Sequence, residues 1–170
     1  RGRAGGYTLK LPLEEKRLQS KKEFIDDIAM SLGGYVAEQM IFGDITTGPS
    51  SDLQMATNLA RAMVTRFGMS DVIGPIALVG AGGRPQYNEI TEREYSESVS
   101  SKIDAEVSRI INDGIKSAEK VLVEHKKAFD AIARKLIEVE TLEQEEYEKI
   151  LTAHGIVLKK KDIIVTSTIV

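Results

Sequence analysis

The sequence has 170 residues, of which 42% are hydrophobic and 29% charged, a composition typical of a globular domain rather than of a disordered chain. Its 26 acidic and 23 basic residues give a formal net charge of −3, so we expect no nucleic-acid binding, which needs a clustered basic face. No apolar run approaches the ~18 residues of a membrane-spanning helix. We therefore expect membrane attachment only through segments outside this sequence.

Cysteine is absent, and the only two histidines are His125 and His154. The absence of cysteine excludes disulfides, thiolate metal sites and a cysteine nucleophile. The two histidines lie far apart in the sequence, without the spacing of metal ligands, and each falls near an expected helix end. A histidine-based metal site therefore cannot be assembled from this sequence alone.

The first predicted element is a short edge strand that ends at Pro12. Apolar and polar side chains alternate over five residues: Tyr7, Thr8, Leu9, Lys10 and Leu11. Such alternation is typical of a half-buried strand. A single strand is not stable alone. We therefore expect its partner strands to lie outside this sequence, or the strand to form the edge of a sheet.

A capping box predicts the start of the first helix, because Ser20 is followed three residues later by Glu23. Apolar residues then recur at intervals of three and four from Phe24 to Ile41, which predicts one amphipathic helix. Gly33–Gly34 falls in the middle of this helix, where glycine is unfavourable. We interpret the pair as a place where another backbone packs closely.

A loop rich in turn residues covers positions 43–51, and a second helix is predicted from about Asp52 to Gly68. Glycine, proline and polar residues then predict another loop over 74–93.

The second half of the chain is predicted to be helical. Apolar residues keep helical spacing from about Ser96 to Glu124, a turn follows near His125, and a return helix comes next. A second capping box, Thr141–Gln144, predicts a last short helix that ends at Gly155. The predicted fold is mainly α, with a small β edge element and a long C-terminal helical hairpin.

Asp52 has two interpretations on the residues alone. It is either an acid at the start of a helix that complements the helix dipole, or a carboxylate that faces a pocket and binds a metal. Carboxylate oxygen is a common protein ligand of zinc.

Several segments of the first half carry a resemblance to a known family, and they occur in the family's order. They are Gly6–Leu9, Leu11–Pro12, Leu32–Glu38, Phe42–Asp44, Thr47–Gly48, Ser51–Leu53, Ala56–Val64, Phe67–Ser70 and Gly74–Pro75. Together they resemble the peptidase part of the FtsH family, the membrane-anchored ATP-dependent zinc metalloproteases. A run in the second half, Ser101–Val107, also matches but is less distinctive, and the resemblance extends from about Arg1 to Ala153.

The resemblance implies roles for three parts of this sequence. In the family, zinc is held by two histidines of an HExxH helix and one aspartate from a later helix, and Asp52 matches that aspartate. Glu38, otherwise an ordinary helix acid, matches a glutamate that hydrogen-bonds a ligand histidine, which would fix the imidazole's orientation. The strand Tyr7–Leu11 would lie beside the active site and pair with extended substrate backbone.

The sequence departs from the family in one large respect, since it contains no HExxH motif. We therefore expect no catalytic residue in this chain and no peptidase activity from it alone. No phosphate-binding loop of the G-x-x-x-x-G-K-[ST] type occurs either. The resemblance implies that ATP and Mg²⁺ bind in an ATPase module that lies upstream. Two smaller departures are Pro49, where alanine is usual, and Tyr87–Ile90.

The function implied by the resemblance is hydrolysis of peptide bonds in unfolded or threaded proteins by a zinc-activated water. The resemblance also implies a homo-hexamer at the cell membrane, with its catalytic part on the cytoplasmic side. The alternative is a catalytically silent helical module that only mediates oligomerisation. We expect a zinc-site subdomain over 1–93, a helical hairpin over 94–155 and a tail over 156–170.

Overall fold

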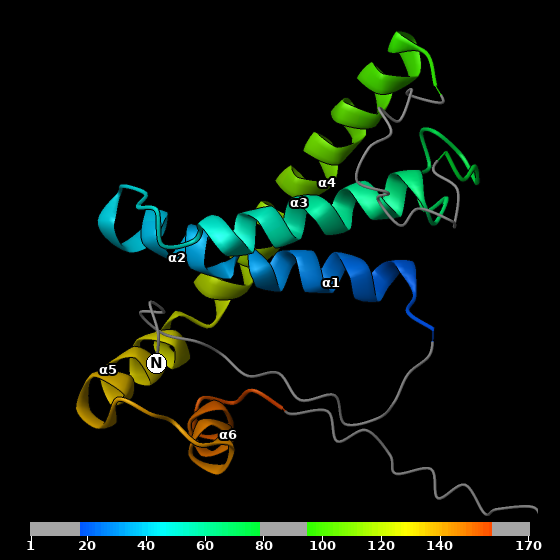
Figure 1. Ribbon diagram of the computed structural model, residues 1–170. Helices are drawn as coiled ribbons and strands as arrows, with labels where there is room; N and C mark the ends of the chain where they lie inside the picture. Colours follow the sequence, from blue (N-terminus) through cyan, green and yellow to red (C-terminus); the bar gives the residue numbers. More distant parts are fainter. Residues whose placement is uncertain (1–17, 79–94, 158–170) are drawn as a thin grey trace, which may run out of the picture.

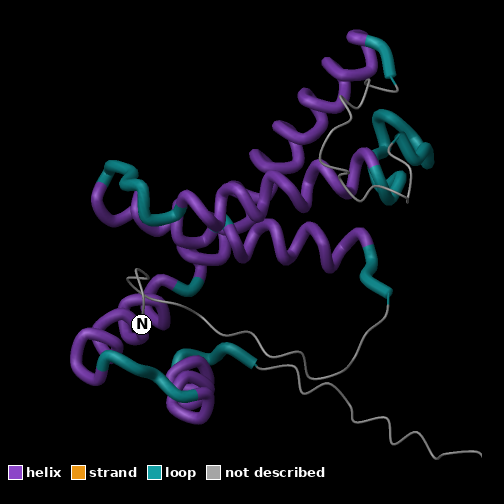
Figure 2. The backbone as a smooth tube through the Cα atoms, in the orientation of Figure 1, coloured by secondary structure: helices purple, strands orange, loops and turns teal. Residues whose placement is uncertain are grey.

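The computed structural model describes residues 18–78 and 95–157. Within these ranges it contains helices and loops and no strand (Figure 2). The helices are α1 (Lys21–Ser31), α2 (Gly33–Phe42), α3 (Ser50–Thr65), α4 (Glu97–Glu124), α5 (Lys126–Val139) and α6 (Gln144–Ala153). The mainly α class is confirmed, whereas the predicted strand Tyr7–Leu11 lies outside the described residues. None of the described helices is both long and apolar enough to cross a bilayer.

The long helix α4 organises the described part of the chain (Figure 1). Helices α1 and α3 lie side by side, and both pack against α4, which α2 also contacts. The predicted turn after α4 is present at His125, and α5 then packs against α6. The loop between α2 and α3 lies at one end of the region where α1, α3 and α4 pack together (Figure 1).

The core forms where the apolar stripes of α1, α3 and α4 meet, as the helical spacing predicted. The largest fully buried side chains are Ile28, Leu32, Met63, Val64 and Ile103. Burying a side chain of this size contributes about 1.5–3 kcal/mol to stability. Because α4 supplies part of this core, the helices on both sides of residue 93 pack together; the division into subdomains stays a prediction.

The single helix predicted from Ser20 to Ile41 is two helices. The chain turns at Leu32, which caps the end of α1 and the start of α2 and is fully buried. Among residues 18–78 and 95–157, no atom of another segment lies within 4 Å of a Cβ placed on Gly33 or Gly34, so no described backbone packs closely against the pair as the sequence predicted. Close packing occurs at Gly114 of α4 instead, where a Cβ would lie 2.9 Å from Leu32 Cδ1.

Two of the predicted helix starts are found at the expected residue, one lies within two residues of it, and one predicted capping box is wrong. The Ser20–Glu23 capping box is present, and Ser96 caps α4. The box predicted at Thr141–Gln144 is wrong, since the cap of α6 is Glu143 and its side chain makes no cap hydrogen bond. Helix α3 begins at Ser50, two residues before the expected start, because Pro49 occupies the cap position.

Candidate functional site

The loop between α2 and α3 carries the chain from Glu38 toward Asp52. It starts at Gly43, whose left-handed backbone (φ 66°) ends α2, with its N–H donating to the Gln39 carbonyl at 3.1 Å. A residue with a side chain is strained in that conformation, so glycine suits this position. The loop then runs over the surface, and residues 43–48 are all exposed.

The half-buried carboxylate of Glu38 holds this loop through Thr46. The Thr46 N–H donates to Glu38 Oε2 at 2.8 Å, and the Thr46 hydroxyl donates to the same carboxylate at 3.0 Å. The Thr46 hydroxyl oxygen in turn accepts a hydrogen bond from the Gly48 N–H at 3.0 Å. We call these three residues the loop network.

Asp52 lies in the first turn of α3, directly after the loop. Pro49 is buried and its carbonyl accepts the first helical hydrogen bond, from Leu53 N–H at 2.9 Å. The Asp52 side chain is half-buried, and within the described part of the chain it has no hydrogen bond or ion pair. Its position complements the helix dipole and leaves its oxygens available to a ligand; both interpretations of Asp52 are compatible with this geometry.

The described residues do not form a complete metal centre by themselves. Residues 18–78 and 95–157 contain no group of three or more His, Cys, Asp or Glu side chains that could hold a metal ion. The histidines lie at helix ends, as expected: His125 between α4 and α5, and His154 after α6 with Nδ1 2.8 Å from the Ile150 carbonyl oxygen. On its own, Asp52 fits the role of one ligand but does not make a site.

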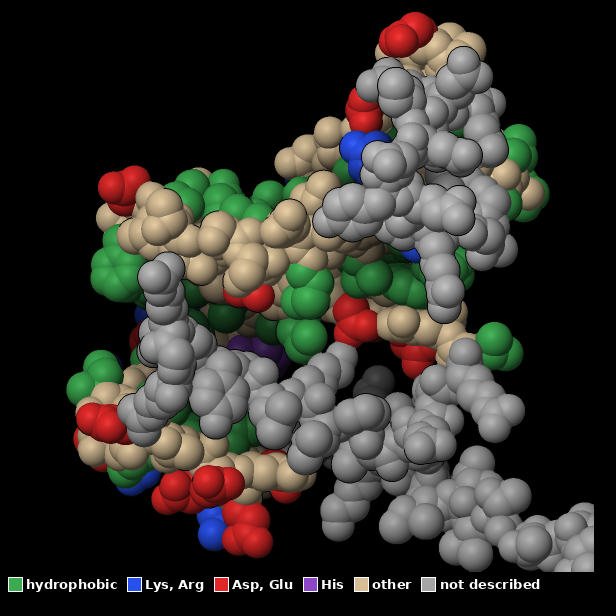
Figure 3. All heavy atoms as spheres, in the orientation of Figure 1, with side chains coloured by type: hydrophobic (Ala, Val, Ile, Leu, Met, Phe, Trp, Pro, Cys, Tyr) green, Lys and Arg blue, Asp and Glu red, His purple; other side chains and the backbone are tan. Residues whose placement is uncertain are grey.

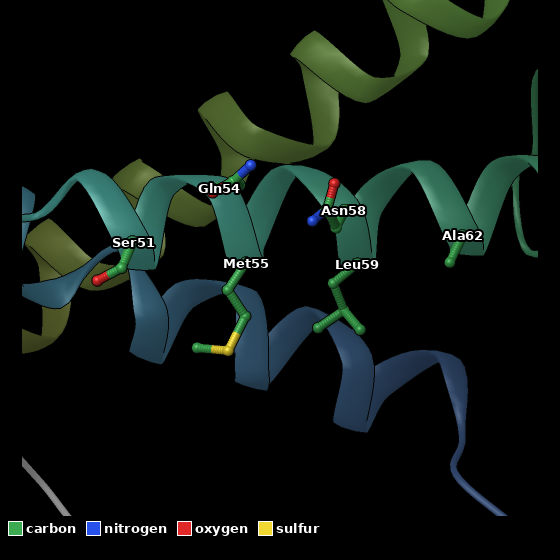
Figure 4. A pocket seen from close by; sticks show the side chains of 6 residues that line it. All are labelled: Ser51, Gln54, Met55, Asn58, Leu59 and Ala62. Carbon is green, nitrogen blue, oxygen red and sulfur yellow. The ribbon is translucent and has the colours of Figure 1, made fainter. Parts of the chain in front are cut away.

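An open depression runs along α3 from the turn that holds Asp52 (Figure 4). It is lined by Ser51, Gln54, Met55, Asn58, Leu59 and Ala62. The side chains of Met55 and Leu59 point from α3 toward α1 (Figure 4). Figure 3 shows hydrophobic side chains exposed on this face of the molecule, and Met55 is 51% exposed. The helical stripe indicated only the buried side of α3, so the sequence did not predict this surface.

A second polar cluster lies at the other end of α3 and was not predicted. Glu106 of α4 is only 3% exposed; its carboxylate accepts hydrogen bonds from Arg109 Nε at 2.7 Å and from the Ser70 hydroxyl at 3.0 Å. The Arg109 guanidinium holds the pKa of Glu106 below its ordinary value, against the opposing effect of burial. Ser70 also accepts from the N–H groups of Val72 and Ile73, so the cluster fixes the turn after α3.

Comparison with known proteins places the chain in a family. The sequence profile described as peptidase family M41 matches residues 1–150. The chain belongs to peptidase family M41. The M41 match includes Glu38, Asp52 and the predicted strand Tyr7–Leu11.

Curated relatives share the M41 region with this chain. It is 43% identical over 159 residues to ATP-dependent zinc metalloprotease FtsH 1 of Thermoanaerobacter sp., which covers 92% of this chain and 26% of the relative. ATP-dependent zinc metalloprotease FtsH of Bacillus subtilis is 40% identical over 162 residues, covering 91% and 25%. The Veillonella parvula FtsH is 44% identical over 149 residues, covering 84% and 23%. The chain thus spans about a quarter of the length of these M41 relatives.

Proposed function

We propose that the chain is part of the peptidase domain of an ATP-dependent zinc metalloendopeptidase that hydrolyses peptide bonds of unfolded or threaded proteins. The observation that carries this proposal is the M41 match over residues 1–150, together with relatives at 40–44% identity that are named ATP-dependent zinc metalloproteases. In the full-length protein, a zinc ion held in part by Asp52 would supply an activated water and would polarise the peptide carbonyl.

Asp52 is proposed as a zinc ligand. Three features support this role: its place in the first turn of α3, its partial burial, and the absence of a competing partner in the part of the chain that the structure describes. The other ligands would come from an HExxH segment, which the printed sequence does not contain. We therefore propose that this chain alone does not hydrolyse peptides.

Glu38 is proposed to orient a ligand histidine by accepting a hydrogen bond from its imidazole. Its carboxylate already accepts from Thr46. An ionised carboxylate has about four acceptor sites, so the bonds to Thr46 leave room for an imidazole N–H. Glu38 would thus hold the loop and a ligand at the same time.

The remaining partners are proposed from the same family membership. The strand Tyr7–Leu11 would pair with extended substrate backbone, a mode of binding that tolerates many side chains. ATP and Mg²⁺ would be bound by an ATPase module in a homo-hexamer. The catalytic part would lie on the cytoplasmic side of a membrane.

A second candidate is a catalytically silent helical module that mediates oligomerisation. It is favoured by the hydrophobic side chains that α5 leaves exposed, namely Leu136, Ile137 and Val139. Contiguous exposed apolar side chains of this kind often mark interaction sites.

Zinc content and proteolysis separate the two candidates when the full-length wild type is compared with its Asp52→Ala variant. We expect this variant to lose bound zinc and proteolysis while its helical circular-dichroism signal is kept. The matched control is Glu145→Ala, which removes an acid from the first turn of α6 and so loses a comparable helix-dipole interaction. Glu145→Ala should keep both zinc and activity. Normal zinc content in Asp52→Ala would show that Asp52 is not a ligand.

A further inference from the structure

The first turn of α3 is held by the buried Pro49, whose carbonyl accepts from Leu53 N–H at 2.9 Å, but it has no capping side chain. The cap residue Pro49 provides no side-chain hydrogen bond to the helix, and the six residues before it are exposed. A helix start without a capping side chain leaves N–H groups unpaired and less restrained. The position of Asp52 therefore depends on contacts made by the loop that precedes it.

We propose that Thr46 and Gly48 are positioning residues that set the place of Asp52 through the loop network. The inference rests on the proposed role of Asp52 as a zinc ligand. The network ties the loop to α2 at Thr46, six residues before Asp52, and Gly48 follows within the same network. From Gly48 only Pro49, Ser50 and Ser51 separate the network from the ligand.

The hydrogen bonds of the loop network form a chain that runs from Glu38 through Thr46 to Gly48. The Thr46 N–H and hydroxyl both donate to the Glu38 carboxylate, which makes both bonds charge-assisted and stronger than neutral ones. The Thr46 hydroxyl oxygen then accepts from Gly48, which extends the restraint toward α3. A ligand side chain has to be held within about 0.5 Å of its productive position, which an unrestrained surface loop does not achieve.

Gly48 contributes by its lack of a side chain. A Cβ atom there would lie 3.1 Å from Glu38 Oε1 and 3.2 Å from Thr46 Oγ1, a distance that forces the two oxygens to move. Gly48 is not among the glycines with positive φ, so alanine is compatible with its backbone. A methyl group at Gly48 therefore acts on the loop network and not on the local conformation.

The experiment measures the zinc dissociation constant of the full-length protein by competition with a chelator. Thr46→Val removes the hydroxyl at nearly constant shape, and Gly48→Ala crowds the network. We expect each to weaken zinc binding about 10-fold or more, the effect typical of losing a group that orients a metal ligand. The melting temperature should change little, because the affected hydrogen bonds lie on an exposed loop and outside the apolar core.

Two controls make the test specific. Thr46→Ser keeps the hydroxyl and should restore zinc binding. Thr47→Val makes the same chemical change one residue later, where the side chain has no hydrogen bond in the described part of the chain. It should bind zinc as the wild type does.

The outcomes distinguish this inference from the proposed function. If Asp52→Ala loses zinc while Thr46→Val and Gly48→Ala bind it normally, Asp52 is a ligand but the loop network does not position it. Equal losses in Thr46→Val and Thr47→Val would likewise overturn the inference. If Asp52→Ala keeps zinc, the ligand role itself is wrong and the positioning role falls with it.

Discussion

Glu106 is a charged residue that is almost fully buried in the described part of the chain. Its buried carboxylate forms an ion pair with Arg109 and accepts a hydrogen bond from the Ser70 hydroxyl. Glu106→Gln keeps an acceptor for Ser70 but loses the charged partner of Arg109. We expect it to lower the free energy of unfolding by about 1.5–3 kcal/mol, as for hydrogen bonds to charged groups. Urea denaturation of the 170-residue chain measures this change.

An exposed ion pair between α3 and α4 provides the control. Asp104 pairs with Arg61 at 3.1 Å, and both side chains are about half exposed to solvent. Asp104→Asn should change stability by only about 0–1 kcal/mol, because water and salt screen such a pair. A Glu106→Gln effect no larger than this would show that the buried pair adds no net stability.

The pH dependence of the Glu106 contribution has a definite sign. Its pKa in the folded chain is lowered from the ordinary value of 4.5, so the unfolded chain binds protons first as the pH falls. The stabilisation is complete above pH 4.5 and is lost as the pH falls through the folded pKa. The stability difference between wild type and Glu106→Gln should therefore be constant near neutrality and shrink in acid. A difference that grows on acidification would contradict this assignment.

Single residues were predicted from the sequence where their partners are close in the chain. The Ser20–Glu23 capping box and the first-turn place of Asp52 follow from spacings of three or four residues. Thr46 bonds Glu38 across eight positions, and Ser70 bonds Glu106 across 36, and no spacing rule covers such pairs. The loop network could be inferred only from coordinates.

At the scale of helices, the contact at Gly114 determines how closely α4 approaches α1. A Cβ there would lie 2.9 Å from Leu32 Cδ1 and 3.0 Å from Ile28 Cγ2, and both side chains are fully buried. Alanine normally stabilises a helix interior by about 1 kcal/mol relative to glycine. Here we expect Gly114→Ala to destabilise the chain, because overpacking a buried contact costs about 1–3 kcal/mol. Thermal unfolding followed by circular dichroism gives the comparison.

Gly34→Ala is the matched helical control. A Cβ at Gly34 meets no described residue within 4 Å, so only the intrinsic helix preference should act. This variant should be as stable as the wild type or more so. If both variants were stabilised, the close approach of α4 to α1 would be wrong.

Helices were predicted more reliably than their interruptions and contacts. The apolar repeat located the buried sides of α1, α3 and α4 because each helix has one stripe facing the core. The break at Leu32 was missed because the apolar repeat continues through it, and the buried leucine fits either structure. Gly114 was missed because the side chains that it accommodates belong to another helix.

At the scale of the whole molecule, the core and the candidate metal ligand are separate. The buried cluster of α1, α3 and α4 is apolar, whereas Asp52 lies in the first turn of α3 and is not part of that cluster. The sequence predicted the helices and their faces but not that α4 would be the helix against which α1, α2 and α3 pack. That arrangement depends on side-chain fit between helices, which spacing does not encode.

This separation predicts that metal removal leaves the fold of the 170-residue chain unchanged. When a metal holds a domain together, a chelator unfolds it, because binding energy and folding energy are then the same. Here the core is made of apolar side chains. EDTA should therefore leave both the helical circular-dichroism signal and the melting temperature unchanged. After dialysis the chain should hold less than one zinc per molecule, since a lone carboxylate is a weak ligand. Stoichiometric zinc, or melting that shifts with EDTA, would mean that further ligands lie within these 170 residues.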